Sequence, residues 1–184
     1  MLNSTALTSK RLIFLVIVWV AIVLCSILYA SLSKVRSFDP QNKFFLQTSE
    51  ERFEQRFLSA LGESLALSPN MVISFSGLGC FCETLAASHL ERIEALAIDE
   101  GFQFNDLDIT LKNMRDFLPS TPAIAVINDL GSLSYLGPIG AGPLCAQSND
   151  LVGKFIKKNT RSSLVGSLIV SDTKGCYCNA LTAS

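Results

Sequence analysis

The chain of 184 residues contains one histidine, His89, and no G-x-S-x-G sequence. These two absences exclude the usual serine hydrolase site, which needs a histidine base and an exposed nucleophile. The G-x-x-x-x-G-K-[ST] phosphate-binding pattern is also missing, although residues 137–145 hold three glycines and two prolines. We therefore interpret that stretch as a flexible loop.

Positive charge is scarce beyond residue 36. Residues 37–184 hold 11 Lys and Arg against 16 Asp and Glu, a net charge of −5. Nucleic-acid-binding domains carry clustered basic side chains, so we expect no nucleic-acid partner. The carboxylates are numerous, but their spacing marks no acid–base pair.

Charge is absent altogether from residues 12–32. As a helix this stretch is about 31 Å long, which predicts one transmembrane helix after a short segment, residues 1–11. Balanced basic flanks leave its orientation undetermined: Lys10, Arg11, Lys34 and Arg36. A cleavable signal peptide is the alternative, with Ser31-x-Ser33 as the small-residue site, although its apolar region is normally shorter.

We interpret residues 37–47 as a polar stretch with one proline, and we predict a juxtamembrane tether over residues 33–47. Residues 48–184 are enough for one domain with its own core. Thr48 and Glu51 form a T-x-x-E capping box that predicts a helix start. An apolar stripe at four-residue spacing follows it: Phe53, Phe57, Leu61 and Leu65.

Residues 71–99 form the centre of the expected domain. Residues 71–75 predict a buried strand, residues 76–79 a break and residues 83–98 a helix. Cys80 and Cys82 lie at this strand-to-helix junction. Unpaired backbone N–H groups at a helix start favour an anion, and a thiolate is an anion. His89 lies about 10 Å of helix beyond Cys82, so we interpret it as a packed or surface residue.

Further elements are predicted from the remaining patterns. They are a strand at 102–109, a helix at 112–118, a hairpin of strands 123–127 and 133–136, a helix at 149–159 and a strand at 165–170.

The predicted domain has five cysteines: Cys80, Cys82, Cys145, Cys176 and Cys178. An odd count in an exported domain leaves at least one thiol free, metal-bound or intermolecular. A disulfide between Cys80 and Cys82 would close a tight ring, which is easily reduced. Cys176 and Cys178 have three interpretations. They are a second redox couple, partners of Cys80 and Cys82 in a zinc, copper(I) or iron–sulfur site, or a structural disulfide with Cys145.

The order helix, strand, cysteine pair, helix, strand, helix, Thr121-Pro122, hairpin, helix resembles the thioredoxin fold over residues 48–160. The resemblance implies a three-layer α/β/α sandwich with a mixed sheet and a cis Pro122 beside the cysteines. It also implies that Cys80 is the attacking thiolate and Cys82 the resolving thiol. The chain departs from the family in having C-x-C for C-x-x-C. It is also similar to a group of bacterial membrane-anchored thioredoxin-like proteins with a glycine-rich loop ending in cysteine, as at Cys145, and a second G-C-x-C, as at residues 175–178.

We therefore expect a membrane-tethered thiol–disulfide exchange protein of the bacterial envelope, with a thiol-containing protein partner and no required cofactor. One span in the inner membrane would place the domain in the periplasm. A thiolate module for copper or zinc is the first alternative, and a redox-inactive structural domain on the same fold is the second.

Overall fold

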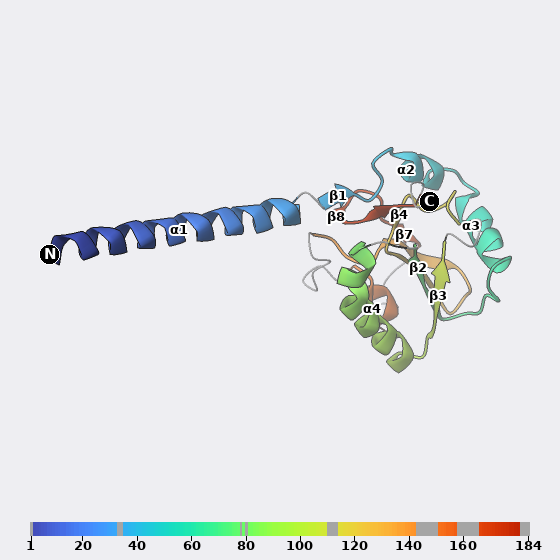
Figure 1. Cartoon of the computed structure of the whole chain (residues 1–184). Helices are drawn as coiled ribbons and strands as arrows, with labels where there is room; N and C mark the ends of the chain where they lie inside the picture. The colour runs from blue at the N-terminus through green and yellow to red at the C-terminus, as the bar shows by residue number, and fades with distance from the viewer. Residues whose placement is uncertain are drawn as a thin grey trace. The chain divides into compact units, whose positions relative to one another are not determined.

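The computed structural model describes residues 2–32, 35–77, 79, 81–109, 114–142, 151–157 and 166–180. The chain divides into two compact units between Lys34 and Val35. The first is helix α1 (Leu2–Leu32), drawn in Figure 1. Its stretch Lys10–Tyr29 has a mean hydropathy of 3.0, and none of it is buried. The predicted apolar helix is thus confirmed, with a length and composition that fit either a membrane anchor or a signal sequence.

The second unit begins at Val35 rather than at residue 48. Strand β1 (Val35–Ser37) pairs antiparallel with β8 (Lys174–Cys176), and helix α2 (Lys43–Thr48) follows. Phe38 and Phe44 are fully buried in the main core. Most of the predicted tether is therefore folded structure. Phe38 has polar neighbours and Phe44 begins the short run Phe44-Phe45-Leu46, so neither marks a buried element in the sequence.

Helix α3 (Phe53–Gly62) carries the predicted stripe, and its first three apolar members are buried. The predicted capping box does not form. Thr48 ends α2 and its hydroxyl donates to the Phe45 carbonyl at 2.9 Å, while Arg52 occupies the N-cap of α3 without a side-chain bond. The threonine thus closes the preceding helix instead of opening the next one.

Five strands form one mixed sheet in the order β3-β2-β5-β6-β7. Their bounds are Met71–Ser76 (β2), Gln103–Asp108 (β3), Ala123–Ile127 (β5), Leu133–Pro138 (β6) and Leu168–Ile169 (β7). β2 runs parallel to β3 and antiparallel to β5, β5 and β6 form the predicted hairpin, and β7 is parallel to β6. Helix α4 (Phe81–Asp99) connects β2 to β3, so the central strand–helix–strand prediction is confirmed.

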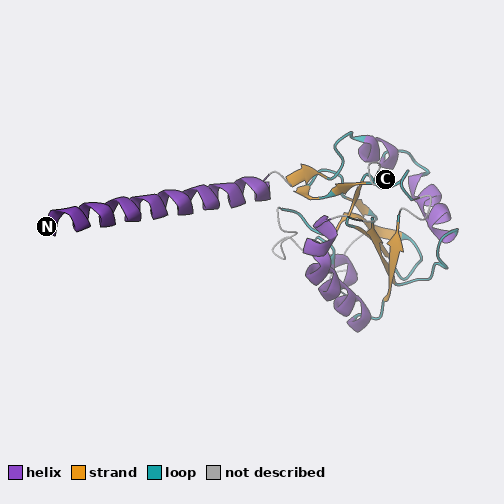
Figure 2. Cartoon of the chain, in the orientation of Figure 1, coloured by secondary structure: helices purple, strands orange, loops and turns teal. Residues whose placement is uncertain are grey.

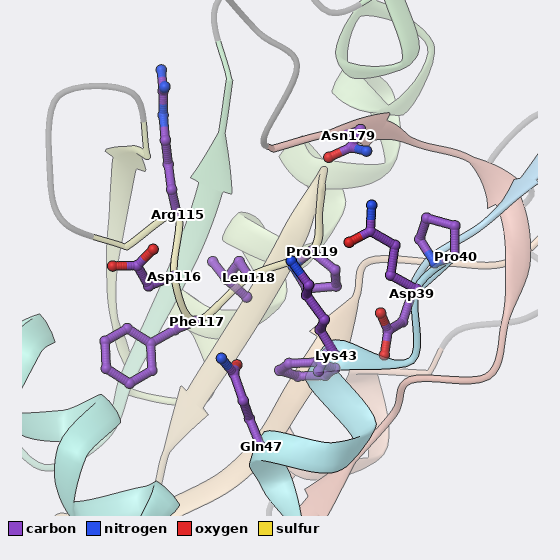
Figure 3. Close-up of a pocket in the computed structure, with 12 residues that line it drawn as sticks. Asp39, Pro40, Lys43, Gln47, Arg115, Asp116, Phe117, Leu118, Pro119 and Asn179 are labelled. Carbon is purple, nitrogen blue, oxygen red and sulfur yellow. The ribbon is translucent and has the colours of Figure 1, made fainter.

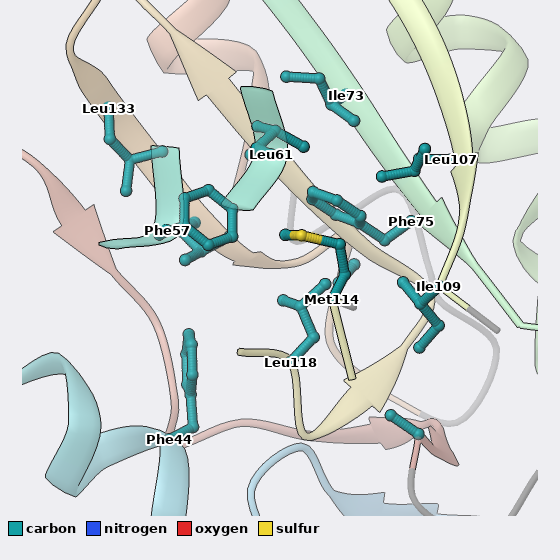
Figure 4. Packing of buried hydrophobic residues seen from close by; sticks show 14 of the residues in the cluster. Phe44, Phe57, Leu61, Ile73, Phe75, Leu107, Ile109, Met114, Leu118 and Leu133 are labelled. Carbon is teal, nitrogen blue, oxygen red and sulfur yellow. The ribbon is translucent and has the colours of Figure 1, made fainter. Parts of the chain in front are cut away.

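Helices cover both faces of this sheet (Figure 2). Alternate side chains of β2 lie in two hydrophobic cores, one on each face of the sheet. Ile73 and Phe75 pack with Phe57 of α3 (Figure 4), whereas Val72 packs with α4 and with helix α5 (Gly153–Ile156). The residues of β2 are apolar except for Ser74 and Ser76, and this pattern follows from burial on both sides, as in parallel sheets. The protein is a mixed α/β domain behind an apolar N-terminal helix.

Three short elements differ from expectation. A helix was predicted at 112–118, and the described residues 114–117 form a turn there. A second helix was predicted at 149–159, and the described residues 151–157 hold one helical turn, α5. The strand predicted at 165–170 is reduced to the two residues of β7. A two-residue pair that no pattern predicted, β4 (Ser120–Thr121) with β9 (Cys178–Asn179), joins the start of the hairpin to the C-terminal segment.

Candidate functional site: a cystine at the start of helix α4

The first buried residue of α4 is Cys82. The helix buries one face at spacings of three and four residues: Cys82, Ala86, His89, Ile93 and Ala97. Three leucines lie on the flanks of this face and are only partly buried: Leu85, Leu90 and Leu96. The buried His89 agrees with its interpretation as a packed residue. The small side chains at the start of the helix leave room for sulfur atoms from another element.

That element is the C-terminal ribbon, β8 and β9. Tyr177 stands between its two cysteines and lies in the main core, edge-on to Phe38 with ring centroids 5.2 Å apart. The Tyr177 hydroxyl donates to the Gly140 carbonyl at 2.7 Å. A Cβ on Gly175 would lie 2.7 Å from the Tyr177 ring, so this position requires glycine. With Tyr177 in the main core, Cys176 and Cys178 belong instead to a cluster with α4.

Cys82 and Cys176 form a disulfide, with an S–S distance of 2.09 Å and Cα atoms 5.3 Å apart. Both are buried, with 4% and 0% of their surface exposed. Cys178 packs against the same cluster, is half-buried and is disulfide-bonded as well. The structure therefore brings Cys82 of the first C-x-C motif together with both cysteines of the second at the start of α4.

This pairing differs from the disulfides considered from the sequence. Cys82 is bonded to Cys176, so it does not close a ring with Cys80, and Cys176 is not bonded to Cys145. The fold explains the difference, because the β8–β1 pair and Tyr177 place Cys176 against the helix start. Cys80 and Cys145 lie outside the described residues, and their predicted roles stay predictions.

A carboxyl group lies next to this cystine in the sequence. The Gly77 N–H donates to Oε1 of Glu83 at 2.5 Å, and the Thr121 side chain hydrogen-bonds to the same carboxyl group. A Cβ on Gly77 would lie 3.1 Å from Thr121 Oγ1, so glycine lets the end of β2 approach Thr121 closely. Glu83 thus fixes the start of α4 to two backbone segments that flank it.

Burial raises the pKa of Glu83 above its ordinary value of 4.5, and the negative charges of Asp106 and Asp108 raise it further. The two hydrogen bonds act in the opposite direction, because they favour the ionised form. Asp106 and Asp108 end β3, where Ser74 donates a hydrogen bond to Asp106. The side chain that follows Cys82 is therefore a carboxyl group that holds its proton more readily than an exposed glutamate.

The Thr121-Pro122 peptide bond is cis, as predicted. Thr121 lies against Gly77 and pairs with Cys178 across the β4–β9 ribbon. The residue before the proline therefore stands between the strand-to-helix junction and the second C-x-C motif. In the sequence Thr121 stood out only as the residue before Pro122, and Glu83 becomes a site residue only through the packing of distant segments.

Metal binding at this site would need a different redox state. Soft metals bind thiolates, and the sulfurs of Cys82 and Cys176 are bonded to each other. Within the described ranges, no group of three or more His, Cys, Asp or Glu has the arrangement of a metal site. A copper or zinc site at the cysteines therefore stays a prediction for the reduced protein.

Fold and site together define a class: a mixed α/β domain behind an apolar helix, with a cystine joining a helix start to a C-terminal ribbon. The chain belongs to the family described as Domain of unknown function (DUF6436), whose family model matches residues 47–180. That span includes both C-x-C motifs. No curated protein and no solved structure matches the chain.

Proposed function

We propose that the protein is a membrane-tethered thiol–disulfide exchange protein. The observation that carries the proposal is the meeting of Cys82, Cys176 and Cys178 at one helix start, with Cys82 and Cys176 joined by a disulfide. A purely structural cystine needs two cysteines, whereas here Cys178 packs beside the bond. Adjacent sulfurs are what an internal exchange reaction requires.

The thioredoxin-like fold that we propose for the domain is supported by its topology. A cysteine lies at the start of the helix after the central strand, and that helix leads into a parallel neighbour. A cis proline precedes an antiparallel hairpin on the other side of the central strand. Helices cover both faces of the sheet. Fold alone does not fix activity, so the functional argument rests on the cysteines.

The exchange reaction balances with a dithiol protein as the reductant. A partner thiolate attacks the disulfide of the half-buried Cys178 and forms a mixed disulfide, which the second partner thiol resolves, so the partner leaves as a disulfide and Cys178 is left as a thiolate. The Cys178 thiolate then attacks one sulfur of the buried Cys82–Cys176 bond and forms a new disulfide with it. The other sulfur leaves as a thiolate and takes up a proton, which the neighbouring Glu83 carboxyl group is suited to supply because of its raised pKa. Each protein disulfide reduced consumes one partner dithiol and produces one partner disulfide.

The location that we propose follows from the helix and the disulfide together. Disulfides persist in oxidising compartments, and an apolar N-terminal helix is typical of chains that are exported or anchored. Both observations favour an extracytoplasmic domain. We propose that α1 stays as a single-pass anchor in the inner membrane and that the domain lies in the periplasm, with a thiol protein of the envelope as its partner.

The proposal is tested by catalysis on a defined substrate. A synthetic peptide with two cysteines is oxidised with glutathione disulfide as the terminal oxidant, in the presence of the full chain in mild detergent. The wild type and the Cys25→Ala control should accelerate the peptide's oxidation equally, because Cys25 is a free, exposed cysteine of α1. Cys178→Ala should be much slower if Cys178 passes electrons to the buried bond.

One observation favours a second function, a structural cystine, namely the burial of both Cys82 and Cys176. A bond without solvent access exchanges slowly unless a neighbouring thiol reaches it. The same assay separates the two functions. A structural cystine gives no acceleration by the wild type, and that result would reject the exchange proposal.

A further inference from the structure

Two large apolar side chains on helix α2 face solvent. Phe45 and Leu46 are 57% and 65% exposed, although the residue before them, Phe44, is buried in the main core. Successive residues of a helix are about 100° apart, so Phe44 fixes α2 to the domain while the next two side chains point outward. The helix is therefore held to the domain by one apolar side chain and presents two others.

The exposed pair borders a hollow in the surface that extends to the β1–β8 ribbon. Ser37 of β1 and Asp172, which precedes β8, line this hollow together with Phe45 and Leu46. Ser37 pairs with Lys174. Cross-strand partners have their side chains on the same face of a ribbon, so the exposed Lys174 belongs to this side as well.

Basic side chains flank the exposed pair. Lys43 begins α2, is exposed and extends toward Pro119 (Figure 3). Arg36 of β1 and Lys174 of β8 are exposed too, whereas Asp172 is the exposed acidic residue of the hollow. Phenylalanine and leucine side chains flanked by lysine and arginine are typical of helices that lie in the interface of a bilayer. We call Lys43, Phe45, Leu46 and Lys174 the α2 face.

The length of the connection to α1 favours a bilayer as the partner of this face. In the sequence only residues 33 and 34 separate Leu32, the last residue of α1, from Val35, the first residue of β1. An extended chain of that length spans at most about 11 Å. Ser37, which lines the hollow, follows two residues later. A bilayer that holds α1 is therefore within reach of β1 and of the hollow beside α2.

We propose that the α2 face docks on the anionic phospholipid bilayer that anchors α1. Phe45 and Leu46 enter the headgroup region, and the Lys43 and Lys174 ammonium groups lie against lipid phosphates. Basic side chains are attracted to an anionic lipid surface, which matches the flanking charges. The proposal rests on the membrane anchor of the proposed function and is independent of the exchange reaction.

Quenching of tryptophan fluorescence by brominated lipids tests the docking on the full chain. The sequence has one tryptophan, Trp19 of α1. The protein is reconstituted into vesicles of phosphatidylethanolamine and phosphatidylglycerol whose acyl chains carry bromine either in the middle or near the headgroup end. Quenching of Trp19 in the wild type by mid-chain bromine establishes that α1 is inserted.

The probe variant combines Trp19→Phe with Phe45→Trp. Asp39 accepts from the backbone N–H of residue 45, so the substitution retains that bond. The matched control combines Trp19→Phe with Leu130→Trp, because Leu130 is 84% exposed and lies between β5 and β6. Bromine near the headgroups should lower the emission of position 45 by at least about twofold and leave position 130 unchanged, since interfacial side chains lie about 5–10 Å into the headgroup and acyl boundary.

Substitutions added to the probe variant separate the apolar from the charged contribution. Leu46→Gln should reduce the quenching of position 45, because it removes apolar surface from the docked face. Lys43→Gln together with Lys174→Gln should reduce it as well, and so should phosphatidylcholine in place of phosphatidylglycerol. Lys157→Gln, which changes an exposed lysine outside the α2 face, should have no effect.

Equal quenching of positions 45 and 130 would overturn the proposal. A blue shift of position 45 that grows with the number of chains per vesicle, without quenching, would identify a second copy as the occupant and also overturn it. Quenching that Leu46→Gln and the two lysine substitutions leave unchanged would do the same. Absence of Trp19 quenching would reject the anchor and the docking together, whereas quenching of Trp19 with none at position 45 would reject the docking alone.

Discussion

Replacing Cys82 and Cys176 together with alanine removes the cross-link between α4 and the C-terminal ribbon. The two residues are 94 positions apart. Loop-closure entropy for a loop of that length gives about 4.7 kcal/mol of stabilisation. This is an upper value, because Cys178 is also disulfide-bonded and a second cross-link already restricts the unfolded chain. We therefore expect the free energy of unfolding to fall by about 2–4 kcal/mol.

The loss is measured by guanidinium unfolding of the full chain in mild detergent, followed by circular dichroism. Cys25→Ala is the matched control, since it removes the free, exposed cysteine of α1 and should leave the midpoint unchanged. Alanine avoids placing a hydroxyl group in the buried site. A double variant within about 0.5 kcal/mol of wild type would refute the reasoning, since that is the range of ordinary surface substitutions.

Three further predictions concern residues around the cystine. The raised pKa of Glu83 implies a stability contribution that is complete below pH 4.5 and lost as the pH rises through the folded-state pKa. Glu83→Gln should therefore gain stability relative to wild type as the pH rises from 4 to 7 in urea unfolding, and a constant difference would contradict this. Gly175→Ala should lower the free energy of unfolding by about 1–3 kcal/mol, because its Cβ would meet the Tyr177 ring. The control is Gly62→Ala, whose Cβ has an ordinary 3.8 Å contact. Equal unfolding midpoints for the two variants would count against the close packing of Gly175 on Tyr177. Tyr177→Phe should lower the free energy of unfolding by about 1–3 kcal/mol, because the Gly140 carbonyl loses its hydrogen-bond donor. An unchanged unfolding midpoint would argue against the hydrogen bond between Tyr177 and Gly140.

The elements that the sequence predicted correctly have strong local signals. Residues 71–75 are apolar except for Ser74 because β2 is buried on both sides, and α4 has 19 residues and a clear start. The hairpin of β5 and β6 combines two apolar runs with a turn. The compact unit begins at Val35 rather than at the expected residue 48, and β1 has no local signal because it depends on pairing with β8, more than 130 positions away.

The candidate site was predictable in part. The two C-x-C motifs marked the cysteines, but spacing does not determine which cysteines pair. The Cys82–Cys176 bond depends on Tyr177 and on the β1–β8 pair, which position Cys176 against α4. Glu83 follows Cys82 in the sequence, but no pattern there marks it as a site residue. Its raised pKa arises from burial and from Asp106 and Asp108, which the parallel β2–β3 pair brings near it.

The reduction potential of the Cys82–Cys176 bond in the folded protein tests the exchange proposal most directly. The full chain is equilibrated in dithiothreitol buffers of defined potential, thiols are alkylated and the fraction reduced is read by peptide mass spectrometry. Near-ultraviolet circular dichroism checks that the domain stays folded. An exchange site predicts reduction of the folded protein at a potential above about −300 mV. A bond that stays oxidised below that potential, and opens only when the domain unfolds, would contradict the account.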